Sequence, residues 1–326
     1  MGLAMVLLWW VFRGQDLNGV GEQIRRASLS LLLLGALMNI AHIPFRVLRW
    51  RYLLDDGGRQ IPFRPLFVAV VVGYMTSWIL PGRLGEIVRP MLLSSRTDVS
   101  LGPALGSVVG DRLLDAVTVA ALFGVASLLV PLEGAVGEHA ALIRGGAGLI
   151  ATVSIAALIV MVLVSRSADT VRRRSAEARG PIRWVIHTVL SLAEGVKPLV
   201  RPRVLFWVAV HSVLAWVAIG LSTYLCIRAS GVEIPLAGVW LIMPLLVLGI
   251  AVPTPGGAGS YHLALKTGVM LFGVTELLAL GAGLLTHLAS TLPVLLLGLL
   301  FLWTEKISWR DMLAAARSRP TAARAG

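Results

Sequence analysis

Long apolar runs separated by short polar or basic connections dominate the chain. Five runs approach or exceed the roughly 20 residues that a helix needs to cross a bilayer. They lie near 29–48, 101–130, 147–164, 204–226 and 277–303. A shorter apolar run at 3–12 crosses only if it recruits its flanks. The pattern predicts an all-α integral membrane protein, a polytopic helical bundle with about six spanning helices.

Two further apolar segments, 66–95 and 237–275, are each interrupted by the same short pattern. Pro81-Gly82-Arg83-Leu84-Gly85 breaks the first segment, and Pro255-Gly256-Gly257-Ala258-Gly259 breaks the second, 174 residues later. Proline removes a backbone donor and glycine loosens the chain. At membrane depth, protein or water must satisfy the freed backbone groups. Paired breaks in corresponding halves are typical of a transporter's binding site.

The distribution of basic residues favours hairpins for both interrupted segments. If every apolar segment crossed once, the basic connections 46–65 and 166–203 would face opposite sides, against the positive-inside rule. If both interrupted segments enter and leave on one side, 22 of the 29 lysines and arginines face the cytoplasm and six face the opposite side. We therefore predict two re-entrant helical hairpins, with the N- and C-termini cytoplasmic.

This arrangement predicts an inverted repeat, because the two halves then hold the same elements in opposite orientation. The first half is 1–130, with a hairpin near 66–95, and the second is 131–310, with a hairpin near 237–275. Residues 311–326 are expected to form a disordered cytoplasmic tail. Two mixed apolar and basic stretches, 14–27 and 180–199, suit interfacial helices, although a polar loop fits the first equally well.

Composition narrows the class of protein. The chain of 326 residues is 57% hydrophobic and 14% charged, far from the balance of a soluble domain. A single cysteine, Cys226, excludes a disulfide framework and a cysteine-based zinc site. The net charge of +12 does not indicate nucleic acid, because the basic residues lie in the connections between spans. The chain has no Walker, G-x-S-x-G or H-E-x-x-H motif, so we expect no cofactor, no metal and no catalytic residue.

Charged residues inside the predicted membrane segments gather around the first break. They are Arg83, Glu86, Arg89, Asp111, Arg112 and Asp115. Helical spacing places Glu86 beside Arg83 and Arg89, and Asp115 beside Arg112, while Asp111 shares a helical face with Asp115. A self-neutralising network that locks the hairpin to the next span and a direct contact with substrate are equally compatible with this pattern. The six residues alone leave the sign of the substrate open, while free backbone donors at the break favour an anion such as phosphate.

The second break carries small and polar residues that suit a binding site. They are Gly256, Gly257, Gly259, Ser260, Tyr261, His262 and Lys266. Close helix packing by small residues is the alternative, but packing alone does not require Pro253 and Pro255.

Other polar residues in apolar runs have simpler interpretations. His42, His211 and His287 are expected to be hydrogen-bonded packing residues, since no pair has metal-ligand spacing. Arg46, Arg49 and Arg51 end a predicted span and are expected to extend toward lipid phosphates. The repeated small residues Gly102, Gly106 and Gly110 predict close helix packing.

Several of these segments together resemble the lysylphosphatidylglycerol synthase transmembrane (flippase-like) family. The similar segments are Leu80–Glu86 with Arg89-Pro90, Gly110–Asp115, Pro255–Gly259, and Arg46–Leu54 with Arg49-Trp50 inside it. The resemblance implies an inner-membrane transporter, not an enzyme, that moves a phospholipid or lipid-linked headgroup across the bilayer. Since about twenty residues follow the last predicted span, we expect the soluble synthase domain to be absent.

The expected partner is a membrane lipid: an anionic or aminoacylated phospholipid, or a polyprenyl-phosphate-linked lipid. A homo-oligomer and a lipid-modifying enzyme partner stay open. Two other functions compete with the flippase. One is an intramembrane enzyme that acts on a lipid headgroup with His262 or Asp111 as base. The other is a membrane scaffold, without transport, for a separate synthase or glycosyltransferase.

Overall fold

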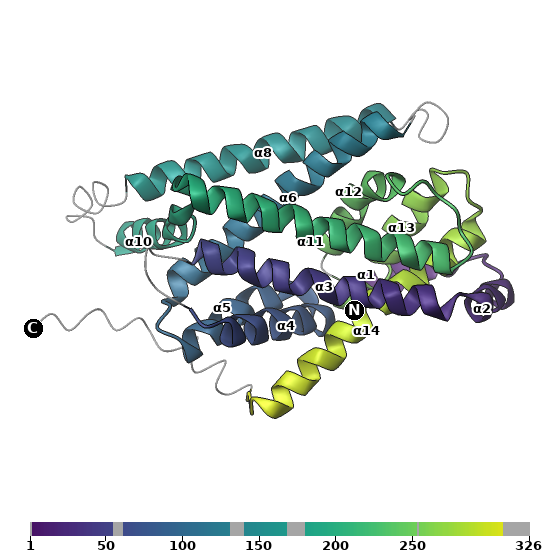
Figure 1. Ribbon diagram of the computed structural model, residues 1–326, viewed down its shortest axis with the longest axis horizontal. Coiled ribbons are helices and arrows are strands. Elements are labelled where there is room, and N and C mark those ends of the chain that lie inside the picture. Colours follow the sequence, from purple (N-terminus) through teal and green to yellow (C-terminus); the bar gives the residue numbers. More distant parts are fainter. Residues whose placement is uncertain (1, 55–60, 131–139, 168–179, 253, 309–326) are drawn as a thin grey trace, which may run out of the picture.

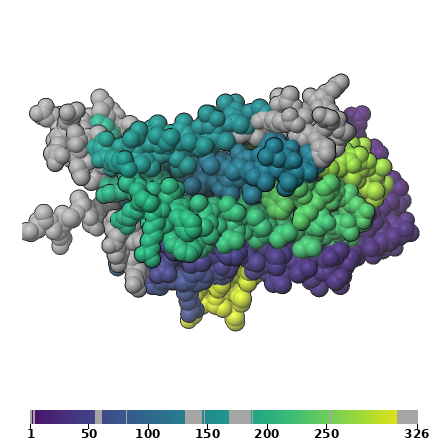
Figure 2. Space-filling model, turned by 45° about the horizontal axis from the view of Figure 1, so that its top comes forward, coloured from purple at the N-terminus to yellow at the C-terminus, as the bar shows by residue number. Residues whose placement is uncertain are grey.

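A computed structural model describes residues 2–54, 61–130, 140–167, 180–252 and 254–308, and all regular elements in these ranges are helices. Five described helices are long and apolar enough to cross a membrane. They are α3 (Leu29–Leu53), α6 (Leu101–Leu129), α8 (Ala140–Arg166), α11 (Pro202–Ala229) and α14 (Glu276–Thr304). They run along the long axis of the molecule or at a tilt to it (Figure 1), and α8, α6, α11 and α3 form adjacent bands across one face (Figure 2).

The prediction of a polytopic helical membrane protein is confirmed, and each of the five predicted spans lies in one of these helices. The short apolar run at the start, whose crossing the sequence leaves open, forms α1 (Gly2–Phe12), and its 11 residues rise only about 16 Å. The first mixed stretch forms a helix, α2 (Leu17–Arg26), capped by the Asp16 carboxylate at its start. The expected tail at 311–326 and Pro253 lie outside the described residues.

The first interrupted segment forms a helical hairpin. α4 (Phe63–Ile79) leads into the short 3₁₀ turn η1 (Pro81–Arg83), and α5 (Gly85–Arg96) returns. Gly82 has φ 73°, a left-handed conformation that glycine adopts without strain. The returning helix packs so closely that a Cβ on Gly85 would lie 1.7 Å from the carbonyl oxygen of Gly73 on α4. Glycine at this crossing therefore allows the two helices to fold back on each other.

The second interrupted segment repeats this geometry. α12 (Gly238–Ala251) leads into the 3₁₀ turn η4 (Pro255–Gly257), and α13 (Ser260–Met270) returns along α12. Gly256 has φ 62°, close to the φ of Gly82. A Cβ on Gly249 of α12 would lie 2.8 Å from the carbonyl oxygen of Ser260, so close packing again involves a glycine.

The two breaks meet beside the middle of α14. A Cβ on Gly256 in η4 would lie 3.0 Å from the carbonyl oxygen of Trp78, near the end of α4. The ring of His287, in the middle of α14, packs against Trp78 from one hairpin and His262 from the other. The hairpins lie toward opposite ends of the long helices (Figure 1).

The open end of each hairpin is held to a different end of α14. Glu305, directly after α14, pairs with Arg64 at the start of α4 at 2.9 Å and with Arg96 at the end of α5 at 2.7 Å. Glu276, the first residue of α14, pairs with Lys266 of α13. One helix thus contacts both hairpins at their mouths and at their tips.

The remaining helices close the bundle around this arrangement. α3 and α11 are antiparallel neighbours, and the Ser222 hydroxyl donates to the carbonyl of Gly35 at 2.7 Å. The glycines at 102, 106 and 110 of α6 approach α10 (Gly180–Glu194) and the residues after it, so the prediction of close helix packing is confirmed. The 3₁₀ turn η3 (Lys197–Val200) then leads into α11.

Candidate functional site

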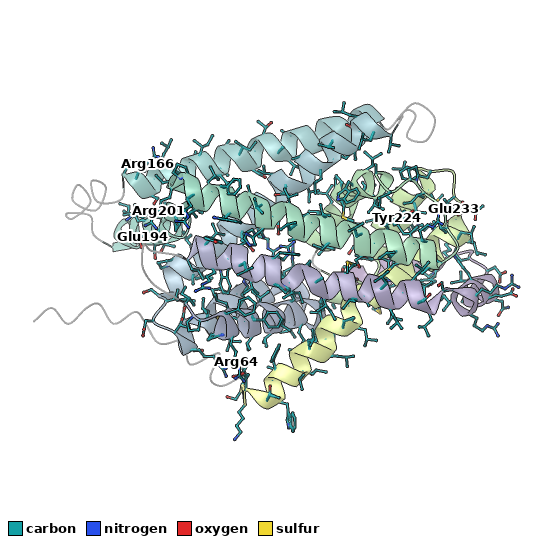
Figure 3. All side chains as sticks on the ribbon, in the orientation of Figure 1. Arg64, Arg166, Glu194, Arg201, Tyr224 and Glu233 are labelled. Atoms are coloured by element: carbon teal, nitrogen blue, oxygen red, sulfur yellow. The ribbon has the colours of Figure 1, made fainter. Side chains whose placement is uncertain are left out.

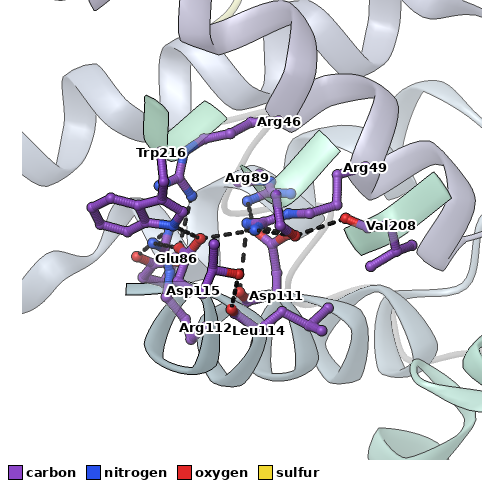
Figure 4. Close-up of polar contacts among 12 residues, drawn as sticks. Arg46, Arg49, Glu86, Arg89, Asp111, Arg112, Leu114, Asp115, Val208 and Trp216 are labelled. Atoms are coloured by element: carbon purple, nitrogen blue, oxygen red, sulfur yellow. Dashed lines mark hydrogen bonds and ion pairs between the residues drawn. The ribbon is translucent and has the colours of Figure 1, made fainter. Parts of the chain in front are cut away.

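A buried network of charged side chains joins α3, α5, α6 and α11 (Figure 4). It forms where the first hairpin packs against α6, on the flank of the largest hydrophobic core. The Arg49 and Arg89 side chains are among the largest that are fully buried in the described chain. A charge in such surroundings is stable only when it is paired and hydrogen-bonded.

Asp115 on α6 is the most highly connected residue of the network. Its Oδ2 accepts from Arg46 at 2.7 Å and from Arg112 at 2.9 Å. Its Oδ1 accepts from Arg49 at 2.8 Å and from the Trp216 indole at 2.9 Å. One carboxylate therefore links α3, α6 and α11 through four donors.

Asp111, one helical turn earlier, links α3 to the first hairpin. Its carboxylate lies 2.8 Å from Arg49 of α3 and 3.0 Å from Arg89 of α5. The Arg89 guanidinium stacks over the Trp50 ring, 3.8 Å from its centroid, a cation–π contact. The Trp50 indole donates to the Ser107 hydroxyl at 2.8 Å, which fixes the ring in place.

The outer edge of the network lies beside the first break and is partly exposed. Glu86 lies 2.9 Å from Arg112 and 3.4 Å from Arg83, which is itself in η1. The exposed fractions of the Arg83 and Arg112 side chains are 35% and 28%, against 0% for Arg49 and Asp111. The chain of ion pairs thus leads from the core of the bundle to its surface.

Positive charge exceeds negative charge in this network. Among the described residues it holds five arginines, at 46, 49, 83, 89 and 112, and three carboxylates, at 86, 111 and 115. Several guanidinium nitrogens, among them Nε and Nη2 of Arg89, are buried without a hydrogen-bond acceptor in the described structure. The surplus of two positive charges suits an anion.

Apolar side chains flank the exposed edge. Leu84 and Ile87 are exposed on either side of Glu86, and Val109 is exposed one turn before Arg112. An amphiphile could therefore place its charged group on the arginines and its apolar part beside these residues.

The second break forms a separate polar cluster. The Ser260 hydroxyl lies 2.9 Å from that of Thr254, and Nε2 of His262 lies 3.0 Å from Nδ1 of His287. The Tyr261 ring packs on His287 with the centroids 4.8 Å apart. A Cβ on Gly259 would lie 2.5 Å from Leu7 of α1, so this glycine allows close packing, whereas a Cβ on Gly257 would lie at an ordinary contact distance of 3.5 Å from the Trp78 ring.

The structure groups the predicted site residues into two sets. Arg83, Glu86, Arg89, Asp111, Arg112 and Asp115 form one network, and the residues from Gly256 to His262 form the other cluster. Lys266 belongs to neither, because it pairs with Glu276 at the far end of α14.

Sequence reasoning missed two central members of the network. Arg46 and Arg49 were expected to extend toward lipid phosphates, but both are buried and pair with Asp115. The reason is that α3 continues to Leu53 and presents both side chains to α6. Their spacing of three residues, which places both on one helical face, was the available signal. Trp216 and Ser212 of α11, which complete the network, carried no signal of their own.

The helical bundle and its buried arginine–carboxylate network define a multi-pass membrane protein built around internal charge. Residues 1–298 match the family described as "Lysylphosphatidylglycerol synthase TM region", and the chain belongs to this family. This confirms the resemblance stated from the motifs.

A curated relative is similar over most of this chain. The relative is "Glycosyltransferase AglD" from Haloferax volcanii, 23% identical over 292 residues. The match covers 80% of this chain but 46% of the relative, so the chain spans about half the length of that protein. Together the family and this relative indicate a function related to membrane lipids.

Proposed function

We propose that the protein is a flippase-like transporter, located in the cell membrane, that moves an anionic phospholipid or lipid-linked headgroup across the bilayer. The observation that carries the proposal is the partly exposed edge of the charged network at Arg83 and Arg112, with a surplus of two arginines behind it. A phosphate group matches guanidinium donors in geometry and charge.

The exposed edge suits a lipid better than a free anion. Leu84 and Ile87 expose apolar surface on both sides of Glu86, so acyl chains remain in an apolar environment while the headgroup contacts arginine. A soluble anion gains nothing from these side chains.

The two hairpins supply the proposed path. We infer that they are re-entrant and related by the inverted repeat, so that each opens toward a different side of the membrane. Their mouths lie at opposite ends of α14 and their tips meet beside its middle, which supports this arrangement. Rocking of one half against the other would expose the charged edge to each side in turn.

The proposed orientation places the basic end of the bundle in the cytoplasm. Arg166 and Arg201 lie at one end and Glu233 lies at the other (Figure 3). In a Cys226→Ala background, Asp98→Cys should react with an impermeant thiol reagent from the cytoplasmic side and Glu233→Cys from the outside. Reaction of both from one side would contradict the orientation and the hairpins.

Transport is tested with purified protein in proteoliposomes. Fluorescently labelled phosphatidylglycerol, an anionic lipid, is compared with labelled phosphatidylcholine, and an impermeant quencher reports the fraction that has crossed. We expect faster translocation of the anionic lipid than in protein-free vesicles. A charge-assisted hydrogen bond contributes about 1.5–3 kcal/mol, so Arg83→Gln should slow translocation about tenfold or more.

The matched control is Arg25→Gln, because Arg25 is an exposed arginine on α2, outside the charged network. Equal rates in protein-containing and empty vesicles would contradict transport. A change in lipid mass during the assay would instead favour the intramembrane enzyme. An Arg83→Gln variant that keeps full activity in cells and binds a synthase would favour the scaffold.

A further inference from the structure

His287 lies at the point where both breaks meet and forms the link between them. Its ring centroid is 5.3 Å from Trp78 of the first hairpin, and 4.8 Å from Tyr261 and 4.6 Å from His262 of the second. Its Nδ1 lies 3.0 Å from Nε2 of His262, within hydrogen-bond distance. The proposed function leaves this pair unused.

The geometry of the pair restricts its protonation. A hydrogen bond between two imidazole nitrogens needs one N–H donor and one lone pair, so the pair in this arrangement holds at most one extra proton. The other nitrogen of His262, Nδ1, is buried and has no hydrogen-bond partner in the described structure. His262 is only 6% exposed. When His262 donates its Nε2–H to His287, its Nδ1 carries a free lone pair that can take a proton in the interior.

No carboxylate faces the pair from the described elements packed against α13. α1 and α12 carry no ionisable side chain, and α4 presents Trp78. The Lys266 ammonium and the Glu276 carboxylate, on α13 and α14, pair with each other. Tyr261 and Cys226, two ionisable groups close to each other at this cluster, are neutral at ordinary pH. Charged side chains on elements packed against α14 have partners elsewhere: Arg46 and Arg49 of α3 pair with Asp115, Arg64 of α4 pairs with Glu305, and Arg228 of α11 pairs with Glu233.

A proton added to Nδ1 of His262 is thus an unbalanced charge at a buried atom. Burial of such a charge is unfavourable unless water or a counter-ion reaches it. Access requires the neighbouring contacts to loosen, and these include the approach of Gly256 to the Trp78 carbonyl, which closes the two breaks against each other. A second proton would place two N–H groups against each other and break the pair itself.

We propose that His262 and His287 form a proton-binding site, and that proton uptake separates the tips of the two hairpins. The inference rests on the proposed transport function, to which it adds the proton as coupling ion. Because one proton is linked to the change, the ratio of separated to closed forms shifts by at most about tenfold per pH unit.

The first measurement is independent of transport. The full chain in detergent is labelled with ¹⁵N-histidine, and the signals of His262 and His287 are assigned by loss in His262→Gln and His287→Gln. We expect the two rings to titrate together, as one coupled pair, as the pH is lowered. Spin labels on Leu84→Cys and Ala258→Cys in a Cys226→Ala background should move apart on acidification, and this change should be lost in both glutamine variants.

His211→Gln is the matched control. His211 is also a buried histidine, but its Nδ1 contacts the Trp207 carbonyl on the same helix, away from the breaks. It should keep the pH-dependent separation. If the pair does not titrate in the wild-type chain, or if separation persists in both glutamine variants, the proton site is overturned.

Translocation then distinguishes failure of this inference from failure of the proposed function. If the wild-type protein moves lipid and both glutamine variants keep the same pH dependence of translocation, the proton site is overturned and transport is supported. If the histidine pair titrates and the hairpin tips separate in a wild-type protein that moves no lipid, the proton site is supported and transport is overturned.

Discussion

Replacement of Asp115 by asparagine tests whether the charged network holds the bundle together. The side chain keeps its shape, but one of its two oxygens becomes an NH₂ donor. If the amide keeps the oxygen toward Arg49 and Trp216, the contacts with Arg46 and Arg112 at 2.7 and 2.9 Å place donor against donor.

The magnitude follows from the lost contacts. Two charge-assisted hydrogen bonds contribute about 1.5–3 kcal/mol each, so Asp115→Asn should lower the free energy of unfolding by about 3–6 kcal/mol. This range agrees with the cost of about 3–5 kcal/mol for removal of one partner from a buried ion pair in other proteins. For a chain of this size, about 2 °C per kcal/mol places the loss in melting temperature at about 6–12 °C.

The assay is thermal unfolding in detergent, followed by intrinsic fluorescence and by loss of the monodisperse peak on size exclusion. Asp98→Asn is the matched control, since Asp98 is exposed between α5 and α6, and its melting temperature should change by less than about 1 °C. A melting temperature for Asp115→Asn equal to that of Asp98→Asn would refute the assignment of Asp115 as the centre of the network.

Two further predictions concern the hairpins. Gly85→Ala should destabilise the chain by about 1–3 kcal/mol or prevent folding, because its Cβ would lie 1.7 Å from the Gly73 carbonyl oxygen. Gly124→Ala on α6 is the control and should leave the melting temperature unchanged in the same thermal assay, because no atom lies within 4 Å of the added Cβ. Equal melting temperatures for the two alanine variants would contradict the close crossing of α4 and α5. The hydrogen bond from Arg96 lowers the pKa of the Glu305 carboxyl. The ionised carboxylate therefore stabilises the fold fully above the unfolded-state pKa of about 4.3, and this stabilisation is lost as the pH falls through the lower pKa of the folded state. Glu305→Gln should therefore lose less melting temperature than the wild type between about pH 6 and pH 3, and parallel pH curves would count against this role.

The membrane fold was largely predictable from the sequence. Each predicted span coincides with one long apolar helix, to within one residue at the end of α6, because a run of about 20 apolar residues is the main sequence signal of a helix that can cross a bilayer. The breaks were equally visible, since Pro and Gly act locally: both Pro-Gly pairs form 3₁₀ turns with a left-handed glycine.

The ion pairs between side chains on different helices could not be predicted from local spacing. Spacing correctly paired Arg83 with Glu86 and Arg112 with Asp115, because residues three apart share a helical face. Arg89, which spacing also placed beside Glu86, instead pairs with Asp111 across the hairpin–α6 interface. Arg46 and Arg49 join the same network only through tertiary packing of α3 on α6, which no local pattern encodes.

The approach of His262 to His287 also depends on tertiary structure, since 25 residues and a helix end separate the two. His287 was expected to be a packing residue bound by hydrogen bonds, and its contacts agree with that expectation. Whether the two halves are related by an inverted repeat stays a prediction.

The carboxylates at the two ends of α14 have a mechanical consequence. Glu276 forms an ion pair at the open end of one hairpin and Glu305 forms ion pairs at the open end of the other, and both carboxylates lie at the ends of the same helix. A displacement of either hairpin along α14 must therefore break the ion pair at that end or move the helix with the hairpin. In the second case the ion pair at the opposite end of α14 carries the displacement to the other hairpin, so the movements of the two hairpins are coupled.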